Sequence, residues 1–173
     1  MFLELIATFI AGIAAAGVLM LVNRALGGRL PRWLIPVAAG AAMLLSTISS
    51  EYSWYSRTAG PLPEGIEVAE TIESKAMYRP WTYAKPYIER FVAVDVGTAR
   101  RNPDQPGKVL VDLLFFGRWQ PLQTLAVMFD CTNNMQTLVP EEVNFDENGA
   151  LIGAKWGPIP ADEPTFKLAC GGA

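Results

Sequence analysis

The stretch Leu5–Asn23, LIATFIAGIAAAGVLMLVN, runs for 19 residues without a charged side chain, and Trp33–Ser50 adds a second uncharged stretch of 18 residues. At about 1.5 Å per residue, a helix of either length measures roughly 27–28 Å, close to the ~30 Å hydrocarbon core of a bilayer. The sequence therefore predicts a membrane-embedded helical hairpin within residues 1–50, with helices over about 3–23 and 33–50.

The connection between these helices, residues 24–32, is basic: it contains Arg24, Arg29 and Arg32 and no acidic residue. Short basic loops stay in the cytoplasm, so both chain termini are expected on the opposite side of the membrane. In a bacterium this is the periplasmic side of the inner membrane. The first helix is expected to be retained, because it lacks the basic start of a signal peptide and its apolar run exceeds the usual length of about 7–15 residues.

Both helices are rich in small residues, which allow helix backbones to approach closely inside a membrane. Either the small faces join the two helices to each other, which we favour, or one face also docks onto the helices of a larger complex. Neither span contains an ionisable residue, which argues against a proton or ion path through this chain alone. The candidate packing residues are Ala7, Ala11, Gly12, Ala15, Ala16, Ala38, Gly40 and Ala42.

The part of the chain after the hairpin is acidic, with 11 basic and 16 acidic residues in 51–173, a net charge of −5. Such a balance disfavours nucleic acid as a partner. The chain has no histidine, the commonest general base and metal ligand, and no glycine-rich phosphate loop. We therefore expect no catalytic residues, no metal site and no cofactor. An enzyme that uses carboxylates alone, drawn from Asp95, Asp112 and Asp130, is the remaining catalytic alternative.

Residues 51–90 are expected to form an aromatic connector between the membrane and a folded domain. Within it, the segment 65–75 is ambiguous. Ile66, Val68 and Ile72 alternate as in an edge strand, whereas glutamates three residues apart would form an acidic stripe on a helix. We favour the strand.

The densest aromatic and basic segment of the chain is Tyr78–Tyr87, and its two prolines exclude it from a helix interior or a central strand. Aromatic residues and arginine are enriched where partners bind. The segment is therefore either a contact surface for another protein or a loop that caps the core or lies against lipid headgroups. The candidate contact residues are Tyr78, Arg79, Trp81, Tyr83, Lys85 and Tyr87.

Residues 91–173 have the pattern of a β domain. Short apolar or alternating runs are separated by turn residues, and no long helical period occurs between them. Five or six such strands predict a small antiparallel sheet or barrel. The expected strands cover 91–96, 108–116, 122–129, 135–139, 150–156 and 166–170, with a turn at 146–149.

The two cysteines of the chain, Cys131 and Cys170, both fall at expected strand ends on the oxidising side of the membrane. They permit a single intramolecular bond. A bond between them would close a loop of about 40 residues, which stabilises a domain by about 3–4 kcal/mol. A redox-active pair is the alternative, but it normally requires the close spacing C-x-x-C, which this chain lacks.

Three features of residues 108–170 occur in a known family: an Asp-Cys pair at 130–131, a tryptophan with prolines at 156–160, and the later Cys170. The arrangement resembles the small envelope β domains related to surface-adhesin protein E. The resemblance implies a compact antiparallel sheet closed by a Cys131–Cys170 bond. It implies no adhesive function, because those adhesins are lipid-anchored at the cell surface and this chain has a two-helix anchor.

The sequence thus predicts a non-enzymatic accessory or assembly protein of the bacterial inner membrane. Its hairpin would contact membrane lipid and another membrane protein or complex, and its β domain would dock on the periplasmic face. The alternative is a binding module, tethered to the membrane, that captures a periplasmic ligand or an envelope polymer.

Overall fold

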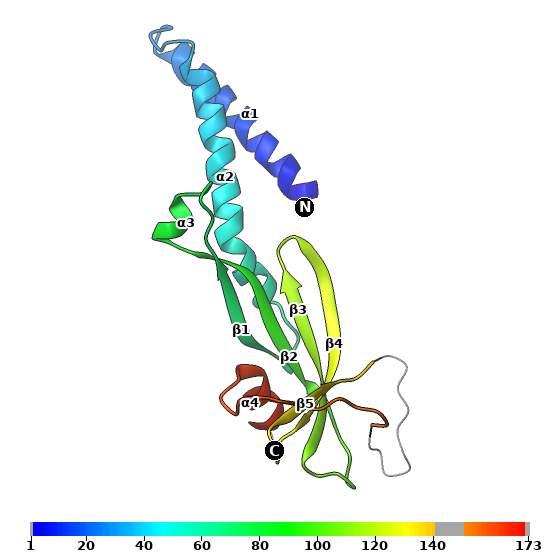
Figure 1. Ribbon diagram of the computed structural model, residues 1–173. Helices are drawn as coiled ribbons and strands as arrows, with labels where there is room; N and C mark the ends of the chain where they lie inside the picture. Colours follow the sequence, from blue (N-terminus) through cyan, green and yellow to red (C-terminus); the bar gives the residue numbers. More distant parts are fainter. Residues whose placement is uncertain (1, 141–150, 172–173) are drawn as a thin grey trace. The chain divides into compact units, whose positions relative to one another are not determined.

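The computed structural model describes residues 2–140 and 151–171. It divides into two compact units, Met1–Arg57 and Thr58–Ala173. The first unit consists of α1, Phe2–Ala25, and nearly all of α2, Leu34–Ala59 (Figure 1). Both helices are long and apolar enough to cross a membrane. This confirms the two apolar helices, whereas their insertion and orientation stay predictions.

The two helices form an antiparallel hairpin that is closed by specific contacts. Gly12 is buried, and a Cβ atom added there would lie 2.5 Å from the Cε atom of Met43, so a larger residue would require the Met43 side chain to move. Near the other end, the Ser50 hydroxyl donates a hydrogen bond of 2.8 Å to the Glu4 carboxylate. Arg57 lies 3.5 Å from the same carboxylate. Glu4 therefore joins the first turn of α1 to the second half of α2.

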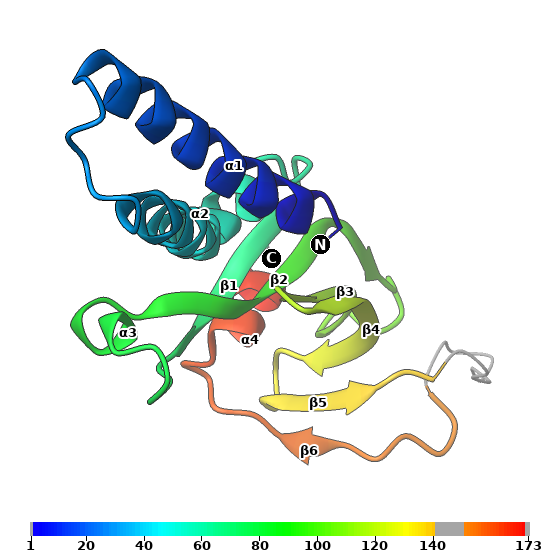
Figure 2. The same ribbon diagram turned by 90° about the horizontal axis from the view of Figure 1, so that it is seen from above.

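The second unit is a curled antiparallel sheet of six strands in sequence order (Figures 1 and 2). Each strand pairs with the next along the chain, and every pair is antiparallel. The short helix α3, Trp81–Ala84, connects the first two strands, and α4, Pro164–Gly171, follows the last. The strands are β1 Ile66–Ser74, β2 Tyr87–Arg101, β3 Lys108–Gly117, β4 Gln120–Asp130, β5 Met135–Leu138 and β6 Gly157–Pro158.

The core of this unit lies between α4 and one face of the sheet. Alternation places the odd-numbered apolar residues of β3 and β4 on that face, including Val109 and Phe129, which are partners in the register. Phe166 of α4 packs edge-on against Phe129, with ring centroids 5.9 Å apart. The predicted disulfide is confirmed: Cys131, just after β4, is bonded to Cys170 of α4. The bond ties the helix to the sheet that it covers.

The strand expected at 166–170 is wrong, because this segment is the helix α4. Pro164 suits the first helical position. The helical period then places Phe166 and Ala169 together on the buried face and leaves Lys167 exposed. A run of five residues fits both the alternation of a strand and the period of a helix. The apolar sheet face that α4 covers favours the helix.

Two other expectations also differ from the structure. The strand expected at 150–156 is absent from its described part, 151–156, apart from a single bridge at Leu151; the last strand is β6 instead. The turn expected at 146–149 lies outside the described residues. By contrast, β1 confirms the strand favoured for 65–75, and irregular register steps at two places explain its imperfect alternation. The sheet thus begins within the predicted connector.

The turn after β4 is organised by Asp130, which is largely buried. One carboxylate oxygen accepts hydrogen bonds of 3.0 Å from the backbone N–H groups of Thr132 and Asn133, and the other accepts one of 2.9 Å from the Asn133 side chain. Burial by itself would raise the pKa of Asp130. The hydrogen bonds from Asn133 and Thr132 and the charge of Lys108 outweigh it, and they lower this pKa below its usual 3.8.

We expect the Asp130→Asn variant to be less stable than the wild type at pH 7, with a difference that shrinks as the pH falls below about 4. A depressed folded-state pKa means that the carboxylate stabilises the fold above the unfolded-state pKa, and that this stabilisation is lost as the pH falls through the folded-state pKa. Urea unfolding of the full chain in a mild detergent at pH 7, 5 and 3 measures the effect. Asp104→Asn, an exposed carboxyl in the loop between β2 and β3, is the control. A stability difference that stays constant across these pH values would contradict the assignment.

Candidate functional site

The concave face of the sheet is longer than the helix that covers it. An eight-residue helix such as α4 measures about 12 Å, whereas the ten residues of β3 span about 33 Å. Among the described residues, 2–140 and 151–171, part of this apolar face therefore has no helix above it. This uncovered part is the candidate site, and we refer to it as the hollow.

A single row of side chains leads from the core into the hollow. Val111 pairs with Val127, and the next pair on the same face is Leu113 with Leu125. The exposed fraction rises along this row, from 1% at Val111 to 7% at Leu113 and 45% at Leu125. Phe115, two residues further along β3, is half-buried. The hollow is thus a continuation of the core surface that α4 does not reach.

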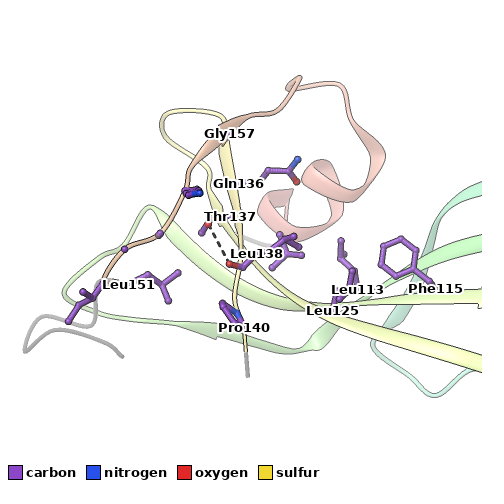
Figure 3. A pocket seen from close by; sticks show the side chains of 14 residues that line it. Leu113, Phe115, Leu125, Gln136, Thr137, Leu138, Pro140, Leu151 and Gly157 are labelled. Carbon is purple, nitrogen blue, oxygen red and sulfur yellow. Dashed lines mark hydrogen bonds between the residues drawn. The ribbon is translucent and has the colours of Figure 1, made fainter. Parts of the chain in front are cut away.

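The opposite wall of the hollow comes from β5 and from residues 151–157 (Figure 3). The hollow is open to solvent, and its volume is about 670 Å³, within the range of about 300–1,000 Å³ typical of small-molecule sites. Leu138 and Ile152 are 64% and 62% exposed, so the hollow opens to the surface on this side. The lining is mainly aliphatic, with polar groups from Gln136, Thr137 and Lys155.

Such a lining suits the binding of an apolar molecule better than acid–base chemistry. No cluster of three or more metal-ligating side chains occurs among residues 2–140 and 151–171. Of the three carboxylates considered from the sequence, Asp95 and Asp112 are brought opposite each other on β2 and β3. Asp112 lies 3.7 Å from Arg100, and Asp95 accepts a hydrogen bond from the Thr98 backbone. Asp130 is instead engaged in its own turn.

The predicted contact segment forms a second surface. Tyr78 and Tyr83 are 76% and 59% exposed, and Lys85 is exposed as well. Arg79 and Trp81 are half-buried, and Tyr87 is buried. The Arg79 guanidinium lies 5.0 Å from the ring centre of Tyr78 and 5.8 Å from that of Tyr87. The segment thus presents aromatic rings stacked with a cation.

Hydrogen bonds hold this segment in place. The turn between β3 and β4 lies beside it, a neighbour that was not predicted from the sequence. The Thr82 hydroxyl donates to the Arg79 carbonyl and accepts from the Ala76 N–H. The turn between β3 and β4 lies beside the start of β2, because the Arg118 N–H bonds to the Glu89 carbonyl. Trp119 in this turn is 50% exposed. A tryptophan in a turn between two apolar strands was the available signal.

The residues singled out in the hairpin are placed as follows. Gly12 contacts the Met43 side chain of α2, whereas Ala7 and Gly40 are exposed. Arg24 lies in the last turn of α1, and all three arginines of the connection are exposed. The half-buried small residues are Ala11, Ala15, Ala16, Ala38 and Ala42.

Comparison with protein-family models, with curated proteins and with solved structures returned no match to this chain. The resemblance of residues 108–170 to the adhesin-related β domains therefore stays a prediction. The hollow and the exposed aromatic residues of the segment 78–87 are the features of the sheet domain that bear on its function.

Proposed function

We propose that this chain is a membrane-anchored, non-catalytic binding protein whose sheet domain captures an apolar or amphipathic small molecule in the hollow. The observation that carries the proposal is the row of Leu113, Leu125 and Phe115, which continues the buried core surface of the sheet and becomes exposed at Leu125. Exposed apolar surface of this kind costs free energy unless something covers it. Lys155 at the edge supplies a positive charge for the polar end of an amphipathic ligand.

The anchor and the compartment are part of the same proposal. Two apolar helices of sufficient length support a membrane hairpin, and the three arginines between them favour a cytoplasmic connection. The Cys131–Cys170 bond supports an oxidising compartment for the sheet domain. In a bacterium, this combination is the inner membrane with a periplasmic domain. The sequence also predicts docking onto a larger complex, and the hollow is the observation that favours ligand binding instead.

A photoreactive fatty acid tests the proposal. The full chain, reconstituted in lipid nanodiscs, is illuminated with stearic acid that carries a diazirine group, and the labelled peptides are identified by mass spectrometry. Labelling of the apolar helices is expected in any case and serves as the internal standard. We expect additional labelling of β3, β4 and residues 151–157. Absence of label from these segments would remove the basis of the proposal.

We expect Leu125→Gln to lower labelling of the hollow by roughly tenfold relative to the helices, because a leucine side chain contributes about 1.5–3 kcal/mol when it is covered. Ile72→Gln on β1 is the matched control, since Ile72 is 44% exposed, Leu125 is 45% exposed, and Ile72 does not line the hollow. The control should label like the wild type. Equal labelling of the two variants would show that the probe does not sit against Leu125.

A further inference from the structure

Several exposed aromatic side chains and five basic residues of the sheet domain lie at one end of the sheet. Residues 75–90 comprise the connection between β1 and β2 and the start of β2, and residues 117–122 comprise the end of β3, the turn and the start of β4. The register brings them together, because Ser74 pairs with Tyr87 and Arg90 pairs with Gly117. We refer to these two segments as the aromatic end.

The composition of the aromatic end is opposite to that of the rest of the domain. It contains five basic residues and one acidic residue, whereas residues 51–173 as a whole have a net charge of −5. Three of its apolar and aromatic side chains are strongly exposed: Met77 is 89% exposed, Tyr78 is 76% exposed and Trp119 is 50% exposed. Arg79 lies over Tyr78, and Arg118 lies 5.0 Å from the ring centre of Trp119.

We propose that the aromatic end is a lipid-contacting surface that rests on the headgroup region of a bilayer containing anionic lipid. Tyrosine and tryptophan are the residues that favour the interface between hydrocarbon and water, because their rings are apolar and their polar atoms reach the headgroups. Lysine and arginine beside them attract anionic headgroups. Exposed methionine and leucine supply apolar surface that enters the acyl boundary.

The chain itself keeps this surface within reach of a membrane. Residues 60–65 connect α2 to β1 and span at most about 20 Å, and the nine residues of β1 add about 30 Å. Because the domain is tethered closely to its own membrane anchor, its contact with the bilayer is intramolecular. The effective concentration of the bilayer surface near the domain is therefore high. Weak contacts of aromatic and basic side chains are then sufficient for a persistent association.

Site-specific fluorescence tests the proposal in the full chain. The two native cysteines are bonded to each other, so a third cysteine can be labelled selectively with an environment-sensitive dye. Met77→Cys reports on the aromatic end, and Asp104→Cys, in the exposed loop at the other end of β2, is the matched control. Both are reconstituted in phosphatidylcholine vesicles with about 30% phosphatidylglycerol and with a nitroxide quencher on a fraction of the headgroups.

We expect quenching of the dye at position 77 and little or none at position 104. Quenching at position 77 should decrease in vesicles of phosphatidylcholine alone and at high salt, because both weaken the attraction of the basic side chains. The double variant Lys75→Gln with Arg90→Gln should reduce it at least about twofold, whereas Lys167→Gln on α4 should not. Equal quenching at the two positions, or none at position 77, would overturn the proposal and leave a protein partner as the occupant.

Discussion

Phe129→Ala is expected to lower the free energy of unfolding of the sheet domain by about 3–5 kcal/mol. Phe129 is fully buried, and its ring packs edge-on against Phe166 of α4. Removal of the ring leaves a cavity at the contact between helix and sheet. It also removes the contact between the two aromatic rings. The disulfide between Cys131 and Cys170 limits how far α4 can move to fill the cavity.

Urea unfolding of the full chain in a mild detergent, followed by tryptophan fluorescence, measures this loss. Phe129→Leu should be less destabilising, because it retains most of the buried volume. Leu122→Ala, on the same strand but 53% exposed, should be nearly neutral. If Phe129→Ala were as stable as Leu122→Ala, the core would not lie between α4 and the sheet.

Removal of the disulfide by the double variant Cys131→Ser with Cys170→Ser is expected to lower the same free energy by about 3–4 kcal/mol. The bond closes a sequence separation of 39 residues, and its loss releases the unfolded chain from that constraint. It also frees α4, an eight-residue helix that is too short to be stable without its contacts with the sheet.

Unfolding of the wild type in the presence and absence of a reducing agent provides the comparison. The reduced wild type should match the double variant, and the reductant should have no effect on the double variant. A difference between the reduced wild type and the variant would show that the serines, not the missing bond, cause the loss. Unchanged stability in both would mean that the packing of α4 alone holds the domain together.

The elements that the sequence predicted correctly are those with an unambiguous period or composition. Leu5–Asn23 is uncharged over a length that only a long helix accommodates, and Lys108–Phe116 is too apolar and β-branched for a surface loop. The cysteine pair followed from having a single possible partner for each thiol. These signals are local, so no knowledge of the tertiary fold was needed to find them.

The errors occur where tertiary contacts decide between local alternatives. The five residues 166–170 alternate like a strand and also fit one turn of a helix, and the concave sheet face selects the helix. The hollow was not predictable at all, because it arises from the difference in length between α4 and β3. Trp119 was visible in the sequence, but its position beside residues 75–90 depends on the register of β2 and β3.

The position of α4 after all six strands has a consequence for the order of folding. Every strand pairs with its neighbour in sequence, so the hairpins can form early from local contacts. The contacts of α4 with β1 and β2 bridge most of the domain and can form only after the whole sheet has emerged during synthesis. Until then, the core and the hollow form one continuous exposed apolar surface. The Cys131–Cys170 bond then holds α4 over this surface, so the last element to be synthesised is also the one that is covalently fixed.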